Sequence, residues 1–374
     1  MPLQKEFFGN KVTLSFFENL LPEGEVRSTI ERNHQLKGTY DLLKSFGRDC
    51  AGAVMVSPNK ESPFQKTEKN LKSKIQMEEI FQAIEEKRSV AEVVANHNPG
   101  YLSIAGAQDK FVSIYEKGEF FLPKNGQPTT HIVKVPIYRS GVIESVYNEY
   151  YCMKLAKRVG LNVPHCEVLN DKKHPLFILE RYDRKTKQKV TRIHQQDFCQ
   201  AQGVVSENKY ESNGGPSLKD NYQLIKSNVT IAKRSKALFE YLDWISFNLL
   251  IGNNDSHSKN ISFLLSNGKI ELAPFYDLLC TEIYPKLKRN FSFVIGDRDG
   301  ASRVGKNQLE MVDNELGLKQ GTMVQRVLGM SEKLMKEKDV LAQEIMKKLP
   351  KANIPKRIAD LIGKRCKSLT RQGL

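Results

Sequence analysis

The clearest hydrophobic pattern in the chain lies between residues 235 and 265. Apolar residues recur there at steps of four, three and four positions, which places them on one buried face of a helix: Leu238, Leu242, Ile245 and Leu249. Gly252-Asn253-Asn254 ends this helix, and two apolar strands follow, 261–265 and 270–275. The pattern therefore predicts a polar loop held between a packed helix and a strand hairpin.

Shorter apolar runs in the N-terminal half are separated by turn residues and predict strands. Their ranges are 111–115, 120–122, 131–136, 163–169 and 176–181. A helix is expected from Ile143 to Arg158, and beyond Thr191 the pattern becomes mainly helical up to Gly252. The sequence thus predicts an α+β fold with two lobes, a small β-rich N-terminal lobe and a mainly helical C-terminal lobe.

These patterns divide the chain into four segments. Residues 1–56 are expected to form a small region with short helical and apolar stretches. Residues 57–76 are rich in Lys, Ser and Pro, which predicts a basic linker or mobile loop. Residues 77–190 then form the β-rich lobe, and residues 191–374 form the helical lobe.

Composition limits the class of protein. The 374 residues include 27% charged and 40% hydrophobic side chains, as in ordinary soluble proteins. The formal net charge of +15 favours an acidic partner, although a lysine-rich surface can also serve solubility alone. No signal peptide or membrane span is recognised. The absence of a CxxC pair favours a reducing cytoplasm for the six cysteines, Cys50, Cys152, Cys166, Cys199, Cys280 and Cys366.

The polar loop carries residues suited to phosphoryl transfer. Asp255 and Asn260 lie five positions apart on it, and Asp277 follows the hairpin. Phosphoryl transfer needs a carboxylate that accepts the substrate hydroxyl proton and an Asn and an Asp that hold Mg²⁺ against the phosphates. Asp and Asn are also common turn formers, so the spacing alone does not decide between catalysis and an ordinary turn.

Further parts of a kinase precede this loop in the expected order. A small-residue segment, 105–110, could bring backbone N–H groups to phosphate oxygens, or could be an ordinary turn. Lys134 interrupts an apolar strand, where it either pairs with a carboxylate or faces solvent from an edge strand. Glu144 and Glu149 on the following helix are its candidate partners. The strand end at 180–182 could form a hinge that binds adenine.

Three known kinase signatures are missing from the chain. There is no G-x-G-x-x-G loop, no H-R-D and no D-F-G, which disfavours eukaryotic-type protein kinases. A small-molecule kinase of the aminoglycoside or choline type remains an alternative, although those enzymes usually carry His where this chain has Asn253. A non-catalytic co-repressor scaffold is a second alternative, but it would have no need for four costly polar groups.

Taken together, the motifs resemble the HipA-like serine/threonine kinase toxins of bacterial toxin–antitoxin modules. The resemblance covers about residues 14–280. It rests on FFENLLPEG (16–24), GRDCAGAV (47–54), SIAGAQDK (103–110), THIVKVP (130–136), NEYYCMKLAKRVGLNVP (148–164), ERYDR (180–184), KYESNGGP (209–216), LLIGNNDSHSKN (249–260) and LAPFYD (272–277).

The resemblance implies a role for each matching residue in Mg²⁺- and ATP-dependent kinase activity. Asp255 would accept the proton, and Asn260 and Asp277 would hold Mg²⁺. Ser103 falls at the family's inhibitory autophosphorylation site. The implied nucleotide contacts are Ala105, Gly106, Ala107, Gln108, Asp109, Lys110, Lys134, Glu180, Arg181, Tyr182, His257, Ser258, Lys259, Asn260, Tyr276 and Asp277.

The resemblance also implies partners. Family members bind a HipB-like helix-turn-helix antitoxin on operator DNA in the bacterial cytoplasm, and their known targets are aminoacyl-tRNA synthetases, notably the glutamate enzyme. The chain departs from the family in two respects. Ser256 replaces the more usual Gly, which a negative φ would accommodate. The chain also begins partway into the usual N-terminal subdomain, so it is expected to be either a natural short form or one that a separate small protein completes.

Overall fold

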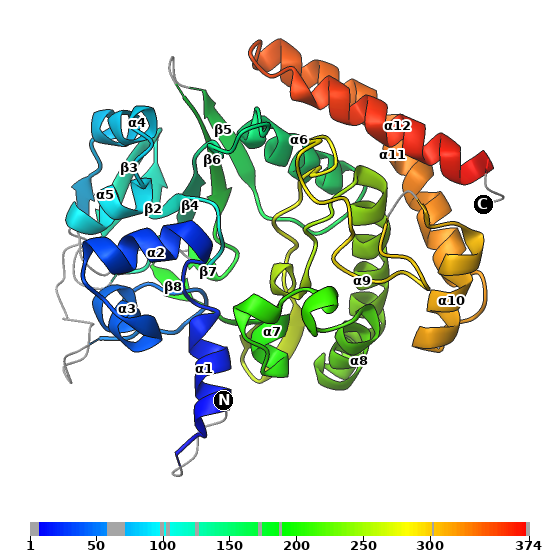
Figure 1. Cartoon of the computed structure of the whole chain (residues 1–374), viewed down its shortest axis with the longest axis horizontal. Helices are drawn as coiled ribbons and strands as arrows, with labels where there is room; N and C mark the ends of the chain where they lie inside the picture. The colour runs from blue at the N-terminus through cyan, green and yellow to red at the C-terminus, as the bar shows by residue number, and fades with distance from the viewer. Residues whose placement is uncertain are drawn as a thin grey trace.

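The computed structural model describes residues 7–57, 72–97, 101, 105–123, 127–170, 174–186, 189–300 and 303–371. A lobe built on a sheet lies at the left of Figure 1, and a lobe of longer helices lies at the right. The chain therefore has the predicted α+β architecture. Most of the predicted linker, residues 58–71, lies outside the described residues, as does Ser103.

The sheet of the left-hand lobe is antiparallel throughout. Its six described strands are ordered β1 (Lys72–Lys74), β3 (Glu119–Pro123), β2 (Lys110–Glu116), β4 (His131–Lys134), β6 (Pro175–Glu180) and β5 (Cys166–Asn170). The strand β4 pairs with β2 on one side and β6 on the other. Because β4 is internal, Lys134 does not lie on a solvent-facing edge strand, and that alternative is wrong.

Alternating side chains cover the two faces of this sheet. Val133 and Ile178 pack against α4 (Met77–Glu85) and α5 (Val90–His97), whereas Phe177 and Leu179 pack against α6 (Ser145–Arg158) and the core of the helical lobe. The period of two in a strand produces this division. It also turns Lys134, the residue after Val133, toward the face where α6 lies.

A small N-terminal subdomain, residues 7–56, lies below the sheet in Figure 1. It contains α1 (Asn10–Glu18), α2 (Gly24–Asn33) and α3 (Gly38–Phe46). Its apolar residues form a core that includes Ala91 and Ala95 of α5, so the subdomain is packed against the β-rich lobe.

The right-hand lobe is built around α9 (Ile231–Ile251). The other helices described there are α7 (Phe198–Gln202), α8 (Leu218–Asn228), α10 (Lys306–Leu316), α11 (Thr322–Lys348) and α12 (Ile354–Arg371). Three described strands form a second sheet in the order β11 (Lys269–Leu272), β10 (Ser262–Ser266) and β9 (His194–Asp197), and β7 (Arg184–Thr186) pairs with β8 (Val190–Arg192). None of the helices in the described ranges combines the length and the apolar character that crossing a bilayer requires.

Two details of the helical lobe differ from the sequence pattern. The sequence pattern predicts separate helices near 320–338 and 340–348, whereas the structure has one continuous helix, α11. The amphipathic pattern of α9 describes only its first half, because every residue from Trp244 to Ile251 is buried. A helix in the middle of a lobe is enclosed by neighbours on all sides, and its pattern of apolar residues then no longer marks a single buried face.

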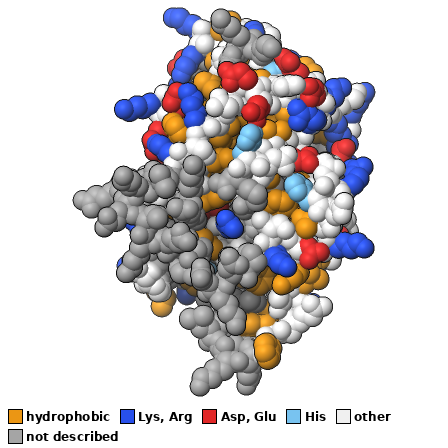
Figure 2. Space-filling model, turned by 90° about the vertical axis from the view of Figure 1, so that its left-hand side faces the viewer, with side chains coloured by type: hydrophobic (Ala, Val, Ile, Leu, Met, Phe, Trp, Pro, Cys, Tyr) orange, Lys and Arg blue, Asp and Glu red, His pale blue; other side chains and the backbone are white. Residues whose placement is uncertain are grey.

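The surface at the β-rich end shows how the net charge is distributed there. Figure 2 shows Lys and Arg side chains interspersed with Asp and Glu on this face. Among the described residues visible on this face, Lys and Arg therefore do not gather into one basic patch.

Candidate active site

Lys134 joins carboxylates from both lobes. Its Nζ lies 2.7 Å from Glu149 Oε1 on α6 and 2.5 Å from Asp277 Oδ1, which follows β11. Burial raises the pKa of Glu149 to about 7, although the Lys134 charge opposes this. Burial acts in the same direction on Asp277, but the Lys134 ammonium outweighs it and lowers the pKa of Asp277 to about 2. Asp277 is therefore an anion beside the Lys134 ammonium.

The two candidate partners of Lys134 have different roles. Glu149 makes the ion pair, whereas Glu144 lies at the start of α6 with a φ of 52°. The Glu144 Oε2 atom accepts the backbone N–H groups of Asn353 at 2.7 Å and Ile354 at 2.8 Å. Glu144 therefore binds N–H groups at the start of α12 that have no partner within the helix, and it does not pair with Lys134.

The polar loop after α9 is held by its own side chains. Gly252 ends the helix with a φ of 72°, a left-handed conformation that suits glycine. The Asn253 amide donates to Asn248 Oδ1 at 2.8 Å, and the Asn260 amide donates to the Asp255 carbonyl at 2.9 Å. Ser256 is not among the described residues with a positive φ. A serine can therefore take the place of the more usual Gly here without backbone strain.

The Asp255 carboxylate is the accessible group of this loop. Its side chain is 48% exposed, and Oδ1 accepts a hydrogen bond of 2.5 Å from the Tyr210 hydroxyl. A carboxylate that accepts a hydrogen bond from a hydroxyl has the contact that a general base requires. The loop thus presents a carboxylate that already binds a hydroxyl donor.

The small-residue segment lies against Lys110. Gly106 has a φ of 120°, a conformation that favours glycine, and a Cβ built there would lie 2.6 Å from Lys110 Nζ. Lys110 pairs with Lys134 across β2 and β4. Burial and the neighbouring Lys134 lower the pKa of Lys110 to about 8. Two lysines are therefore side by side at the ends of adjacent strands.

Other side chains in this segment have structural partners. The Gln108 amide donates to the Val135 carbonyl at 2.8 Å. The Asp109 carboxylate accepts the N–H of Val90 at 2.7 Å and the Ser89 hydroxyl at 3.0 Å, at the start of α5. Both side chains therefore fix the segment to its surroundings, and a nucleotide contact from positions 108 and 109 stays a prediction.

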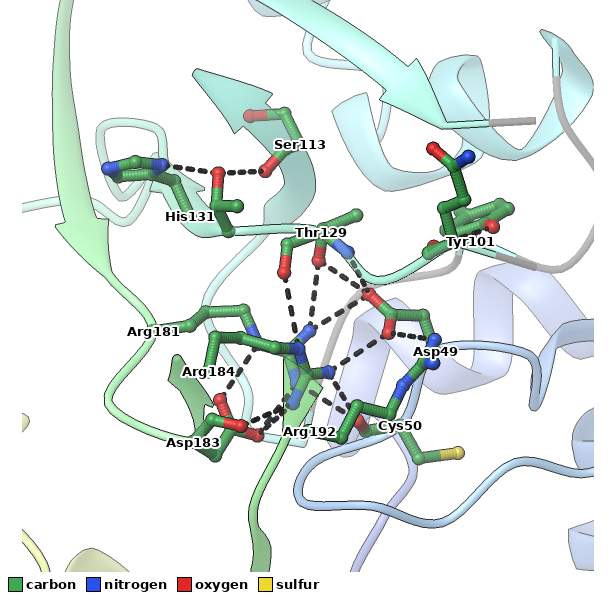
Figure 3. A network of polar contacts seen from close by, with 12 residues as sticks. Asp49, Cys50, Tyr101, Ser113, Thr129, His131, Arg181, Asp183, Arg184 and Arg192 are labelled. Carbon is green, nitrogen blue, oxygen red and sulfur yellow. Dashed lines mark hydrogen bonds and ion pairs between the residues drawn. The ribbon is translucent and has the colours of Figure 1, made fainter. Parts of the chain in front are cut away.

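The predicted hinge carries a buried ionic network (Figure 3). The Arg181 guanidinium binds Asp183 at 2.8 Å and Asp49 at 3.1 Å, with its side chain only 1% exposed. Its backbone N–H donates to Thr130 at 2.9 Å. The structure therefore directs the Arg181 side chain toward the N-terminal subdomain and does not bring it to the Lys134 cluster.

Tyr182 and Tyr276 lie next to the hinge as a stacked pair, with ring centroids 5.6 Å apart. The Tyr276 hydroxyl donates to the Lys259 carbonyl at 2.7 Å. Ser258 is buried, and its hydroxyl accepts from the Asn221 amide at 3.0 Å. The Tyr276 hydroxyl thus fixes the end of the polar loop, and Ser258 anchors the same loop to α8.

His257 provides a prediction on pH. Its ring is 5% exposed and packs edge-on against Tyr210. Burial lowers the pKa of His257 to about 4, despite the opposing Asp255 carboxylate 3.9 Å away; Glu23, Lys209 and Lys259 also face it.

Because the unfolded state binds this proton first, the stabilisation from neutral His257 is complete above a pH of about 6.5 and is lost as the pH falls toward 4. We expect His257→Gln to reduce this loss of stability on acidification, as measured by urea unfolding between pH 7 and 4.5. Equal pH dependence in the two proteins would show that His257 does not titrate in this way.

Asn260 and Asp277 fit a magnesium ion. A carboxamide oxygen and an ionised carboxylate are hard ligands, and Mg²⁺ normally takes only one or two protein oxygens beside phosphates and water. The Asn260 amide nitrogen already donates to the Asp255 carbonyl, which leaves its oxygen as the group able to face a cation. Among the described residues no cluster of three His, Cys, Asp or Glu suggests another metal site.

Sequence reasoning missed three residues around this site: Glu23, Asp49 and Tyr210. Each contacts a site segment more than forty positions away, as the 2.7 Å pair of Glu23 with Lys259 illustrates. No periodicity or local spacing connects such positions. The only available signal was their presence in the segments 16–24, 47–54 and 209–216, which carried the family resemblance.

A strand lysine paired with a helix glutamate, facing a loop with Asp-x₄-Asn and a further Asp, defines a protein-kinase-like phosphotransferase. The comparisons with known proteins place it within that class. The model of the HipA-like C-terminal domain matches residues 102–338, and the model of the HipA N-terminal domain matches residues 1–57. The chain belongs to the HipA family and is a serine/threonine protein kinase.

Individual relatives agree with this assignment. The putative kinase Y4mE of Sinorhizobium fredii is 36% identical over 80% of this chain and 71% of its own length. The serine/threonine-protein kinase toxin HipA of Shewanella oneidensis is 30% identical over 89% of this chain and 78% of its own. A solved complex of Shewanella oneidensis HipA with HipB and operator DNA contains a chain with a TM-score of 0.82 and 26% identity, covering 96% of this chain and 86% of that one.

Proposed function

We propose that this kinase transfers the γ-phosphate of Mg·ATP to a serine or threonine of a host translation factor and thereby arrests growth. An aminoacyl-tRNA synthetase, the glutamate enzyme first, is the proposed substrate. The observation that carries the phosphotransferase chemistry is Lys134, which contacts Glu149 and Asp277 within 2.7 Å. The substrate class rests on the HipA family alone.

Each polar group of the site has a proposed task. Asp255 accepts the proton of the attacking hydroxyl, for which its exposed carboxylate is placed. Lys134 and Lys110 attract the phosphates, Glu149 keeps the Lys134 ammonium in place, and Asn260 and Asp277 hold the cation. Bound Mg²⁺ supplies neutralisation of the phosphate charge. Backbone groups of 105–107 contact phosphates, and those of Glu180 and Tyr182 contact adenine.

The kinase activity is tested by transfer of radiolabelled phosphate from Mg·ATP into proteins of a bacterial lysate, followed by mass spectrometry of the labelled bands. A labelled aminoacyl-tRNA synthetase supports the proposed substrate. Label confined to other proteins, or to small molecules, contradicts it. The same samples test proposed autophosphorylation at Ser103, which would place a charge of about −1.5 to −2 beside the small-residue segment.

Metal binding provides a further prediction. Asp277→Ala removes an anionic oxygen and should weaken Mg·ATP binding by at least about tenfold, the loss typical even of groups one step removed from a metal. Calorimetric titration of both proteins at limiting magnesium measures the change. ATP without metal serves as the control and should distinguish the two proteins far less. Equal Mg·ATP affinities would remove Asp277 from the metal site.

Regulation is proposed from the same relatives. The Shewanella oneidensis structure contains HipA with HipB and operator DNA. We propose that this chain likewise binds a HipB-like helix-turn-helix antitoxin and reaches operator DNA through it, in the bacterial cytoplasm. All six cysteines are buried thiols, which suits a reducing compartment.

A further inference from the structure

The N-terminal subdomain places one carboxylate beside the catalytic loop. Glu23 precedes α2, and its Oε1 lies 2.7 Å from Lys259 Nζ while its Oε2 lies 2.6 Å from Lys209 Nζ. The three side chains are 13%, 5% and 14% exposed. Burial acts to raise the pKa of Glu23, but the two ammonium groups outweigh it and lower the pKa to about 2. The carboxylate is therefore charged at any physiological pH.

Each of these lysines directly precedes a residue that touches Asp255. Lys259 is followed by Asn260, whose amide donates to the Asp255 carbonyl at 2.9 Å. Lys209 is followed by Tyr210, whose hydroxyl donates to Asp255 Oδ1 at 2.5 Å. A single carboxylate thus ties down the two chain segments that hold Asp255.

The backbone of the same turn reaches the small-residue segment. The Glu23 N–H donates to the Gly106 carbonyl at 3.2 Å, and Pro22 forms an isolated parallel bridge with Gly106. Gly106 in turn lies against Lys110. Residues 22–23 therefore contact the proposed phosphate segment through the backbone and the catalytic loop through the side chain.

The turn is itself firmly held. The Asn19 amide donates to the Val204 carbonyl at 2.8 Å, and the Gln200 amide donates to the Phe16 carbonyl at 2.9 Å. These bonds dock α1 on α7 of the helical lobe, while Asp49 binds the hinge from the other end of the subdomain. Because both ends of the subdomain are anchored, Glu23 is held in a fixed position and can position the two lysines.

We propose that Glu23 is a positioning residue of the kinase, supplied by the N-terminal subdomain, which sets the placement of Asp255 relative to the phosphate segment through Lys259 and Lys209. The inference rests on the catalytic role proposed above for Asp255. An exposed ion pair would contribute little to such a placement. Here one carboxylate binds two largely buried lysines from separate segments.

The test compares Glu23→Gln with Glu18→Gln. Glu18 lies in the same subdomain, is 12% exposed and pairs with Arg27 at 3.0 Å, so it matches Glu23 in burial and in the loss of an ion pair. We expect Glu23→Gln to lower the rate of phosphate transfer at saturating Mg·ATP by about tenfold to a hundredfold, as small misplacements of reacting groups do. Glu18→Gln should keep the wild-type rate, and both should show similar thermal unfolding midpoints. Equal rates in the two variants would overturn the proposal.

A second variant keeps the proposal testable if Glu23→Gln folds poorly. Lys209→Gln removes the ion pair between Lys209 and Glu23 by changing the lysine, and it should lower the rate of phosphate transfer by itself. In the double variant Glu23→Gln, Lys209→Gln, the rate should fall no further than in Glu23→Gln, because the partner of Lys209 is already absent. Independent, multiplicative losses would show that Glu23 does not act through Lys209.

The Asp255→Asn protein separates this inference from the catalytic assignment. An inactive Asp255→Asn together with a fully active Glu23→Gln refutes the positioning role alone. An active Asp255→Asn refutes both, because Glu23 would then position a residue that does not catalyse.

Discussion

Replacing Asp255 with Asn should lower the rate of phosphate transfer by about 10²- to 10⁴-fold, the range expected when a general base is lost. The carboxamide keeps the shape of the side chain and can still accept the Tyr210 hydroxyl, but it cannot take up the proton of the substrate. Because the Asp255 side chain is 48% exposed, losing its charge should cost little stability. ATP affinity should therefore stay close to that of the wild type.

The measurement is the initial rate of radiolabel transfer from Mg·ATP, with nucleotide affinity determined by calorimetry. Asp297→Asn is a matched control, because Asp297 is 49% exposed and lies outside the cluster around Lys134. It should transfer phosphate at the wild-type rate. Near wild-type activity in Asp255→Asn would move the base to another residue and would leave the Tyr210 contact without a catalytic meaning.

The largest effect on stability is expected at Asp49. Its side chain is fully buried and binds three guanidinium groups, Arg181 at 3.1 Å and Arg184 and Arg192 at 2.9 Å (Figure 3). These charges overcome the burial that acts to raise its pKa and lower the pKa to about 2. Asp49→Asn would leave these buried cations with Asp183 as the remaining carboxylate of the network.

Breaking a buried ion pair from one side typically costs about 3 to 5 kcal/mol, and we expect a loss of this size in the free energy of unfolding of Asp49→Asn. Urea unfolding measures it. The control is Asp299→Asn, which removes an exposed pair with Arg303 and should change the free energy of unfolding by about 1 kcal/mol at most. If the two variants lost the same small amount, the network would not be a determinant of stability.

The Asp49 network and Glu23 both connect the N-terminal subdomain to the candidate active site. Asp49 binds the hinge through Arg181, and Glu23 binds the catalytic loop through Lys259. The subdomain therefore spans the two lobes on the side of the active site. We expect any change in its docking to alter both the hinge and the placement of Asp255.

Local patterns predicted those parts of the fold whose neighbours lie close in sequence. The hairpin of β2 and β3, the helix α6 and the end of α9 at Gly252 follow from apolar spacing and turn residues, as expected. The internal position of β4 was not predictable, because strand order depends on contacts between distant segments. Spacing likewise could not separate Glu149 from Glu144 as the partner of Lys134, since only the start of α12 reveals the second role of Glu144.

The candidate site, too, could be predicted only in part, because its residues come from segments far apart in the sequence. Lys134 and Asp277 lie 143 positions apart and are in contact in the structure. This contact could be predicted only because the order of motifs along the chain matched that of a kinase. The side chains of Gln108, Asp109 and Arg181 are taken up by structural hydrogen bonds and ion pairs. A motif identifies a segment, whereas the direction of each side chain depends on packing that sequence spacing does not encode.

The position of the bound cation shows whether Asn260 and Asp277 form the metal site of the kinase. Crystals grown with Mn²⁺ in place of Mg²⁺ and a non-hydrolysable ATP analogue would locate the metal by its anomalous scattering. We expect a peak bonded to the Asn260 side-chain oxygen and the Asp277 carboxylate, with the nucleotide phosphates beside Lys134. A peak bonded to neither residue, or phosphates bound away from Lys134, would contradict the assignment of these residues to the kinase active site.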